Sequence, residues 1–121
     1  MTGAAIIVLG PGGMETARRV QVAVAGSEIH GLAQRVPDAE NTFDDTGAHL
    51  RALFAAGMPI VGICAAGILI RLLAPALADK TAEPPVIAVA EDGSAVVPLL
   101  GGHHGANDLA SDIATALGVS A

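Results

Sequence analysis

The sequence predicts a three-layer α/β fold, in which helices cover both faces of an open and mostly parallel β-sheet. Short, continuous apolar runs that end in glycine are typical of central parallel strands. Segments with helical spacing alternate with these runs along the chain. Two β-rich runs near the C-terminus are separated by a turn that contains Asp92-Gly93, which indicates a β-hairpin at one edge of the sheet.

The composition indicates a single domain, residues 1–121, with a core of small side chains. The chain has 121 residues, of which 52% are apolar. It is large enough to bury one core and too short for a second domain. Phe43 and Phe54 are the only aromatic residues besides histidine, so bases would find almost nothing to stack on. Together with a net charge of −6, this argues against nucleic-acid binding.

The sequence favours a cytoplasmic location. The only cysteine, Cys64, cannot form an internal disulfide, which fits a reducing compartment. The first residues lack the basic segment that opens a signal peptide. Residues 58–78 are apolar enough to suggest a membrane span, but Arg71, Pro59 and Pro75 favour a strand followed by a buried helix.

The first expected strand is the apolar run at residues 4–9, which enters the glycine-rich turn 10–13. Helical spacing follows at residues 14–25, and Gly26 ends that helix. The strand expected next, at residues 28–32, has a weaker pattern.

Further along, residues 35–41 are expected to form a loop. This loop follows the C-terminal end of a second strand, a position where the functional side chains vary. Asp44 or Asp45 can cap a helix that continues through Phe54, with Gly57 as its C-terminal stop. Residues 59–64 form the second strong strand pattern.

The last part of the chain begins with residues 65–78, which are apolar on almost every face, so we expect a helix packed on more than one side. Residues 86–90 and 95–100 form the hairpin, and residues 108–117 form a closing helix that ends at Gly118. This order of elements predicts an open Rossmann-like sheet.

Open sheets of this kind bind ligands beyond the carboxyl ends of their strands, near the N-termini of helices. We expect three segments to converge there: residues 10–13, 62–67 and 101–107. In the first segment, Gly12 and Gly13 either hold an anion through backbone N–H groups or simply turn the chain.

The second segment allows a backbone or a ligand to come close to the start of a helix. The small residues that allow this are Gly62, Ala65 and Gly67. Arg71, about two turns further on, has to reach a carboxylate, a carbonyl or solvent, so it either binds a ligand carboxylate or pairs with Asp79. Cys64 has no base or cation close in sequence and is expected to pack as a small apolar residue.

The third segment places His103 and His104 between glycines at a strand-to-helix junction, where imidazole can act as an acid, a base or a donor to an anion. Asn107 can cap the following helix or donate its amide to a ligand. The alternative is a capped turn with incidental histidines. We expect no metal site, because adjacent histidines on a loop rarely bind the same ion and no third ligand is near.

The segments GICAAGILIRLLAPALADK, PPVIAVAEDGSAVVPLL and GGHHGAN form a longer pattern that resembles the N-terminal region of the CbiG family of cobalamin biosynthesis. The resemblance extends over about residues 54–118, whereas the first half resembles the family only in its α/β pattern. The residues that match are Gly62, Ala65, Gly67, Ile68, Arg71, Ala74, Pro75, Asp79, Lys80, Pro85, Val86, Val89, Asp92, Gly93, Leu99, Leu100, Gly102, His103, Gly105, Ala106 and Asn107.

This resemblance implies cobalt-precorrin-5A hydrolase activity, in which a δ-lactone is opened and acetaldehyde is released. It implies a tetrapyrrole-like substrate with many carboxylates, and a catalytic role for His103 or His104 in activating water, with backbone N–H groups holding the oxyanion. The residues expected to bind substrate are Gly12, Gly13, Gly62, Ala65, Gly67, Arg71, Lys80, Gly102, Gly105 and Asn107.

The short elbow GGHHGAN resembles that of CbiG-type domains fused to a precorrin-3B C(17)-methyltransferase. The chain is then a module of a larger protein, whose partners are a precorrin-type tetrapyrrole and a second CbiG domain or a methyltransferase domain; a homodimer stays open. We expect no cofactor in this domain, with cobalt only in the substrate and S-adenosylmethionine only with a methyltransferase. Two alternatives stay open, a non-catalytic module of such a fusion and a small anion- or nucleotide-binding module.

Overall fold

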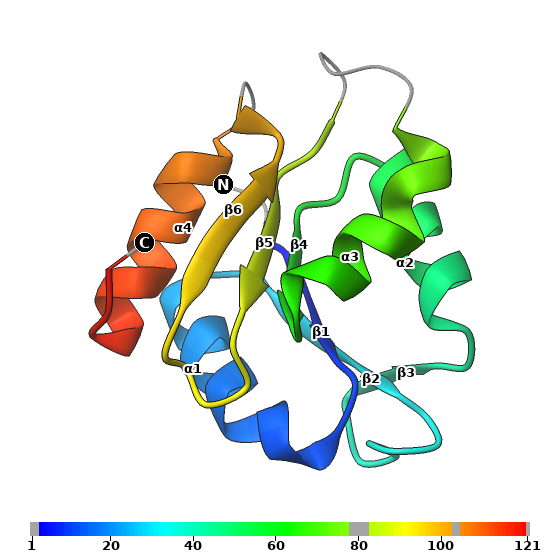
Figure 1. Cartoon of the computed structure of the whole chain (residues 1–121). Coiled ribbons are helices and arrows are strands. Elements are labelled where there is room, and N and C mark those ends of the chain that lie inside the picture. The colour runs from blue at the N-terminus through cyan, green and yellow to red at the C-terminus, as the bar shows by residue number, and fades with distance from the viewer. Residues whose placement is uncertain (1–2, 78–82, 103–104, 121) are drawn as a thin grey trace.

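The computed structural model describes residues 3–77, 83–102 and 105–120, and this part of the chain has the predicted three-layer α/β fold (Figure 1). The strands are β1 (Ala5–Val8), β2 (Glu28–Leu32), β3 (Asn41–Phe43), β4 (Ile60–Ile63), β5 (Val86–Val89) and β6 (Val96–Leu100). The helices are α1 (Met14–Ala23), α2 (Thr46–Ala55), α3 (Ala66–Leu73) and α4 (Ala106–Leu117), with short 3-10 helices η1 (Pro11–Gly13) and η2 (Ala74–Ala76).

The sheet is parallel except at one edge. Within the described residues its strand order is β3-β2-β1-β4-β5-β6, and β5 and β6 are the only neighbours that run antiparallel. Their hairpin turns at Gly93, whose φ of 78° lies in the left-handed region that favours glycine. The predicted fold class and the edge hairpin are therefore confirmed.

Two hydrophobic cores lie on the two faces of the sheet. Helices α1 and α4 cover one face, and helices α2 and α3 cover the other, as Figure 1 shows. In the central strand β1, Ile6 and Val8 pack toward the first pair of helices and Ile7 packs toward the second. Because successive side chains of a strand point to opposite faces, a strand covered on both sides has to be apolar throughout.

The ends of α2 are those that the sequence predicts. The Asp45 carboxylate accepts a hydrogen bond from the Ala48 N–H at 3.0 Å, which is the expected N-cap. Gly57 follows the helix with a φ of 75°. Within the ranges that the structure describes, no helix is long and apolar enough to cross a bilayer, and the apolar stretch at residues 58–78 contains β4 and α3 instead.

Two predictions about the elements are wrong. Strand β3 was not expected, because its three residues Asn41, Thr42 and Phe43 contain no apolar run and its place at the edge of the sheet does not require one. The α-helix α3 stops at Leu73 rather than continuing to residue 78, since Pro75 lacks an N–H and obstructs the preceding turn.

Helix α3 packs on more than one side, as the sequence predicts. Leu69 and Leu73 are buried against the sheet. Leu72 lies against α2, where Nη1 of Arg51 donates to its carbonyl at 3.0 Å and a Cβ on Gly47 would lie 3.4 Å from its Cδ2. Ile70 is 40% exposed, so part of the apolar surface of this helix remains open to solvent.

Candidate functional site

The carboxyl ends of β1 and β4 lie side by side in the centre of the sheet, and the chain leaves them toward opposite faces. After β1 it enters α1 on one face, and after β4 it enters α3 on the other. Such a reversal opens a crevice that is the usual ligand site of an open α/β sheet. A cavity of about 510 Å³ lies at this point.

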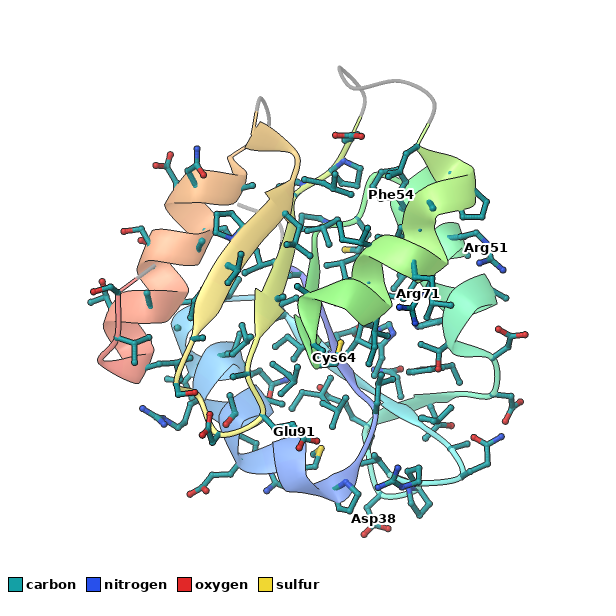
Figure 2. All side chains as sticks on the ribbon, viewed as in Figure 1. Asp38, Arg51, Phe54, Cys64, Arg71 and Glu91 are labelled. Carbon is teal, nitrogen blue, oxygen red and sulfur yellow. The ribbon has the colours of Figure 1, made fainter. Side chains whose placement is uncertain are left out.

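The cavity is mostly apolar, with three ionisable side chains among its lining residues. Its apolar wall comes mainly from Leu9, Ile63, Ala66, Ile68, Ala88 and Val97. The ionisable residues are Arg35, which follows β2, Cys64, which follows β4, and Glu91, which follows β5. In Figure 2, Cys64 lies near the middle of the molecule, between Glu91 below it and Phe54 above it.

Arg35 and Glu91 meet above the turn that follows β1. A Cβ atom placed on Gly10 would lie 3.1 Å from Nη2 of Arg35 and 3.8 Å from Oε2 of Glu91. Opposite charges from two different loops therefore lie close to the same glycine. The hydroxyl of Thr16 donates a hydrogen bond of 2.5 Å to the main-chain carbonyl of Glu91, which holds the hairpin turn against α1.

Cys64 is a neutral thiol at physiological pH. Burial, followed by the negative charge of Glu91, raises the pKa of Cys64 to about 11. The side chain is partly exposed to the cavity. These properties agree with the predicted packing role, because a nucleophilic cysteine needs a lowered pKa.

The turn at residues 10–13 is poorly suited to hold an anion. Pro11 has no N–H, and the N–H of Gly13 donates to the carbonyl of Gly10 at 3.1 Å. The Glu91 carboxylate lies 3.6 Å from the place of a Cβ on Gly12. This geometry favours the turn-forming alternative for Gly12 and Gly13.

Gly62 in β4, and Ala65 and Gly67 after it, have different surroundings. A Cβ on Gly62 would lie 2.8 Å from both Cδ atoms of Leu69, so this glycine allows α3 to approach β4 closely. Ala65 is the N-cap residue of α3 and lines the cavity. Gly67 is exposed, and a Cβ there would meet no atom within 4 Å.

Arg71 is exposed in the last turn of α3 and does not line the cavity. Among the residues that the structure describes, no carboxylate lies within ion-pair distance of its guanidinium. Its alternative partner, Asp79, lies outside the described residues, as does Lys80. Of the three surroundings that the sequence allows for Arg71, namely a carboxylate, a carbonyl or solvent, the structure shows exposure to solvent.

The predicted convergence of all three glycine-rich segments is wrong. Strand β6 runs antiparallel to β5, and Leu100 at its end pairs with Val86 at the start of β5. Residues 101–107 therefore begin at the amino ends of the parallel strands, and Gly101 lies against Pro84. The end of β6 and the start of α4 are at the top of Figure 1, at the opposite end of the sheet from the cavity.

His103 and His104 lie outside the described residues. The described part of the elbow contains Gly105, which is the N-cap residue of α4 with a φ of 94°. Asn107 is the second residue of the helix and does not cap α4, so of its two alternatives the role as a donor to a ligand stays open. Gly102 and Asn107 line a hollow of about 100 Å³ next to the end of β6.

A histidine pair that the sequence did not predict lies between the sheet and α2. Nδ1 of His30 is 2.8 Å from Nε2 of His49, and the His49 ring stacks on Phe43 with a centroid distance of 4.6 Å. Glu28 lies 3.7 Å from the other nitrogen of His30. His30 and His49 are far apart in the sequence, so no local sequence motif predicts their contact. Across the described ranges, no cluster of three or more metal-ligating side chains is present.

The chain is similar to known proteins in family, in sequence and in structure. The family described as “Cobalamin synthesis G N-terminal” matches residues 48–121. A cobalt-precorrin-5A hydrolase from Priestia megaterium is 27% identical over 120 residues, which are 93% of this chain and 32% of that protein. The cobalt-precorrin-5A hydrolase from Salmonella typhimurium is 41% identical over 69 residues, 56% of this chain and 20% of that protein.

The fold is similar to that of a cobalamin biosynthesis protein G homologue from Sulfolobus solfataricus. The TM-score is 0.68 at 22% identity, over 98% of this chain and 35% of that one. The chain thus spans about a third or less of the length of each of these relatives.

Proposed function

The chain belongs to the cobalamin synthesis G N-terminal family, and from this premise we propose that it binds a precorrin intermediate in cobalamin biosynthesis. The family match at residues 48–121 bears out the resemblance on which the sequence analysis relied. The observation that supports the binding role is the cavity, because the matched region supplies the ends of β4 and β5, the start of α3 and the hairpin turn that line it.

The chemistry of the cavity suits part of such a molecule. A tetrapyrrole presents a broad apolar ring edge and several carboxylate arms. The cavity of about 510 Å³ offers an apolar wall for the ring edge or for the stem of an arm, and the Arg35 guanidinium for a carboxylate. The rest of the macrocycle would extend from the cavity along the exposed surface.

Strand β6 connects the cavity to the elbow. Val97 lines the cavity and Leu100 lines the hollow beside the elbow, so the strand advances between them by three residues, about 10 Å. A small ligand cannot contact both places, whereas a macrocycle with extended arms can. A substrate of this size could therefore contact the cavity and the elbow at the same time.

For the chemical step we propose hydrolysis of the substrate lactone at the elbow. His103 or His104 would take a proton from water, and the hydroxide would add to the lactone carbonyl carbon. As the ring C–O bond breaks, the imidazolium would return its proton to the departing alkoxide, which leaves a neutral alcohol and a carboxylic acid that ionises to a carboxylate. Backbone N–H groups at the start of α4 would stabilise the oxyanion. Lys80, Gly102, Gly105 and Asn107 would contact the substrate at this end.

Because the named hydrolases are about three times as long as this chain, we propose that turnover also involves a second domain, of CbiG or methyltransferase type. Cobalt would enter only with the substrate, and S-adenosylmethionine only with a methyltransferase domain. We place this activity in the cytoplasm.

The test is a visible-absorbance titration of the chain with cobalt-precorrin-5A and its metal-free counterpart, followed by an assay for acetaldehyde. His103→Ala/His104→Ala is compared with wild type, and Val22→Thr serves as the control because Val22 is 88% exposed on α1. Saturable spectral change in all three proteins, with product lost only in the double variant, would support both binding and the elbow chemistry.

Binding without product from wild type would retain the binding role and overturn hydrolysis by the isolated chain. Absence of any spectral change at substrate concentrations well above those of the protein would overturn the proposed function.

A further inference from the structure

We propose that Arg35 is the binding site for one ligand carboxylate at the mouth of the cavity, and that Glu91 is a competing negative charge that restricts this site to singly charged anions. The identity of the natural ligand, a carboxylate arm of a precorrin, rests on the proposed function. The site itself rests on the geometry around Gly10.

The two charges come close without forming an ion pair. Nη2 of Arg35 and Oε2 of Glu91 lie within 3.8 Å of the same point, the place of a Cβ on Gly10. Even so, no ion pair within 4.0 Å joins Arg35 to a carboxylate in the described part of the chain. The guanidinium therefore keeps its hydrogen-bonding edge available for a ligand while it lies in the field of Glu91.

Gly10 leaves room for the Arg35 guanidinium. A methyl group at this position would lie 3.1 Å from Nη2, which is closer than ordinary side-chain contact. Glycine therefore lets Arg35 pack against the β1 turn, and a carboxylate would reach the guanidinium from the cavity that Arg35 lines. The neighbouring lining residues Leu9 and Ile63 are apolar, so the stem that carries the carboxylate should be apolar too.

The Arg35 guanidinium favours a carboxylate as the ligand group, and the Glu91 charge disfavours anions that carry two negative charges. A guanidinium presents a planar pair of donors that matches a carboxylate bidentately. A dianion such as a phosphate monoester would gain a similar contact but would suffer stronger repulsion from the Glu91 carboxylate. The site should therefore prefer an alkyl carboxylate to an alkyl phosphate of the same length.

The experiment uses two kinds of probe on the same proteins. Octanoate and octyl phosphate are titrated into ¹⁵N-labelled chain while the amide signals of residues around the cavity are followed by NMR, and cobalt-precorrin-5A is titrated by visible absorbance. The variants are Arg35→Gln and Glu91→Gln. Arg18→Gln is the control, because Arg18 is an exposed arginine of α1 that does not line the cavity. Thermal unfolding checks that each variant is folded.

Arg35→Gln should weaken octanoate binding about tenfold, the range for loss of a hydrogen bond to a charged group. Glu91→Gln should tighten binding of both probes, and of octyl phosphate more than of octanoate. Arg18→Gln should bind as wild type does. Equal binding of octanoate by wild type and Arg35→Gln, or weaker binding by Glu91→Gln, would overturn the proposal.

The two probes separate the two proposals. If octanoate shows the expected pattern and cobalt-precorrin-5A does not bind, the carboxylate site stands and the proposed function fails. If cobalt-precorrin-5A binds wild type and Arg35→Gln equally well while octanoate does not depend on Arg35, the proposed function stands and the carboxylate site is overturned.

Discussion

Nδ1 of His30 lies 2.8 Å from Nε2 of His49, so a hydrogen bond between two imidazoles joins strand β2 to helix α2. One ring has to donate and the other has to accept, which requires at least one neutral histidine at the contact. Burial, followed by the charge of His30, lowers the pKa of His49 below its ordinary value of 6.5. Phe43 stacks on His49 from β3, and Glu28 lies near His30 from β2.

The first prediction concerns pH. The folded chain binds a proton at His49 less readily than the unfolded chain, so this histidine contributes no pH dependence above about pH 6.5 and makes the protein less stable as the pH falls below that value. We expect the midpoint of urea unfolding to decrease between pH 7.5 and pH 5.5.

The matched variant is His49→Gln, which keeps a polar side chain and removes the titrating group. Its stability should change less over the same interval, although it should be lower at pH 7.5 because the contact with His30 is lost. An unchanged slope in His49→Gln would show that other groups cause the pH dependence.

The second prediction compares Gly62 of β4 with Gly67 of α3. Gly62→Ala should destabilise the fold by about 1–3 kcal/mol, because the new Cβ would lie 2.8 Å from both Cδ atoms of Leu69 and push α3 away from β4. Gly67→Ala should stabilise it by about 0.4–1 kcal/mol, because this helical position is open and alanine restricts the unfolded chain.

Urea denaturation of the two variants measures both changes. They share the same chemical substitution five residues apart, so a difference in sign tests the packing itself rather than alanine in general. If both variants lost stability equally, the close contact between α3 and β4 would be contradicted.

The central elements of the fold could be predicted because their sequence signals are strong. β1 and β4 are continuous apolar runs since both their faces are buried, and the ends of α2 carry a capping aspartate and a left-handed glycine. β3 could not be predicted because an edge strand of three residues needs few apolar side chains. Its existence depends on pairing with β2, which is not a local property.

The candidate site was harder to predict than the fold. The sequence predicts the hairpin of β5 and β6, and its one reversed strand places Gly101, Gly102 and the start of α4 at the opposite end of the sheet from the cavity. Arg35 and Glu91 looked like ordinary loop charges in the sequence. Only the parallel order of β2, β1, β4 and β5 brings their two loops together over Gly10.

The third prediction concerns the reactivity of Cys64. With the pKa of the thiol raised to about 11, only about 0.1% of it is ionised at pH 8, so alkylation by iodoacetamide should be much slower than for a free cysteine. Glu91→Gln should accelerate the reaction, because the charge of Glu91 is the second cause of the raised pKa. The rate is measured by mass spectrometry of the intact chain between pH 7 and pH 10.

Arg18→Gln controls for a general effect of changing surface charge, since Arg18 lies away from the cavity lining. A wild-type rate close to that of free cysteine would contradict the buried, neutral thiol. Equal rates in Glu91→Gln and wild type would show that Glu91 does not act on Cys64.

The fourth prediction concerns the hydrogen bond that holds the hairpin turn against α1. Thr16 is 4% exposed, and its hydroxyl donates to the main-chain carbonyl of Glu91. Thr16→Val preserves the shape of the side chain but removes the donor, so we expect a loss of about 1 kcal/mol in the free energy of unfolding. Thr16→Ser retains the donor, so it should lose less stability from this hydrogen bond, although it also loses one buried methyl group.

Because the same hydrogen bond positions Glu91 beside Gly10, Thr16→Val should also change octanoate binding at the cavity, whereas Thr16→Ser should not. Equal stability and equal octanoate affinity in Thr16→Val and wild type would show that this hydrogen bond neither stabilises the turn nor orients Glu91.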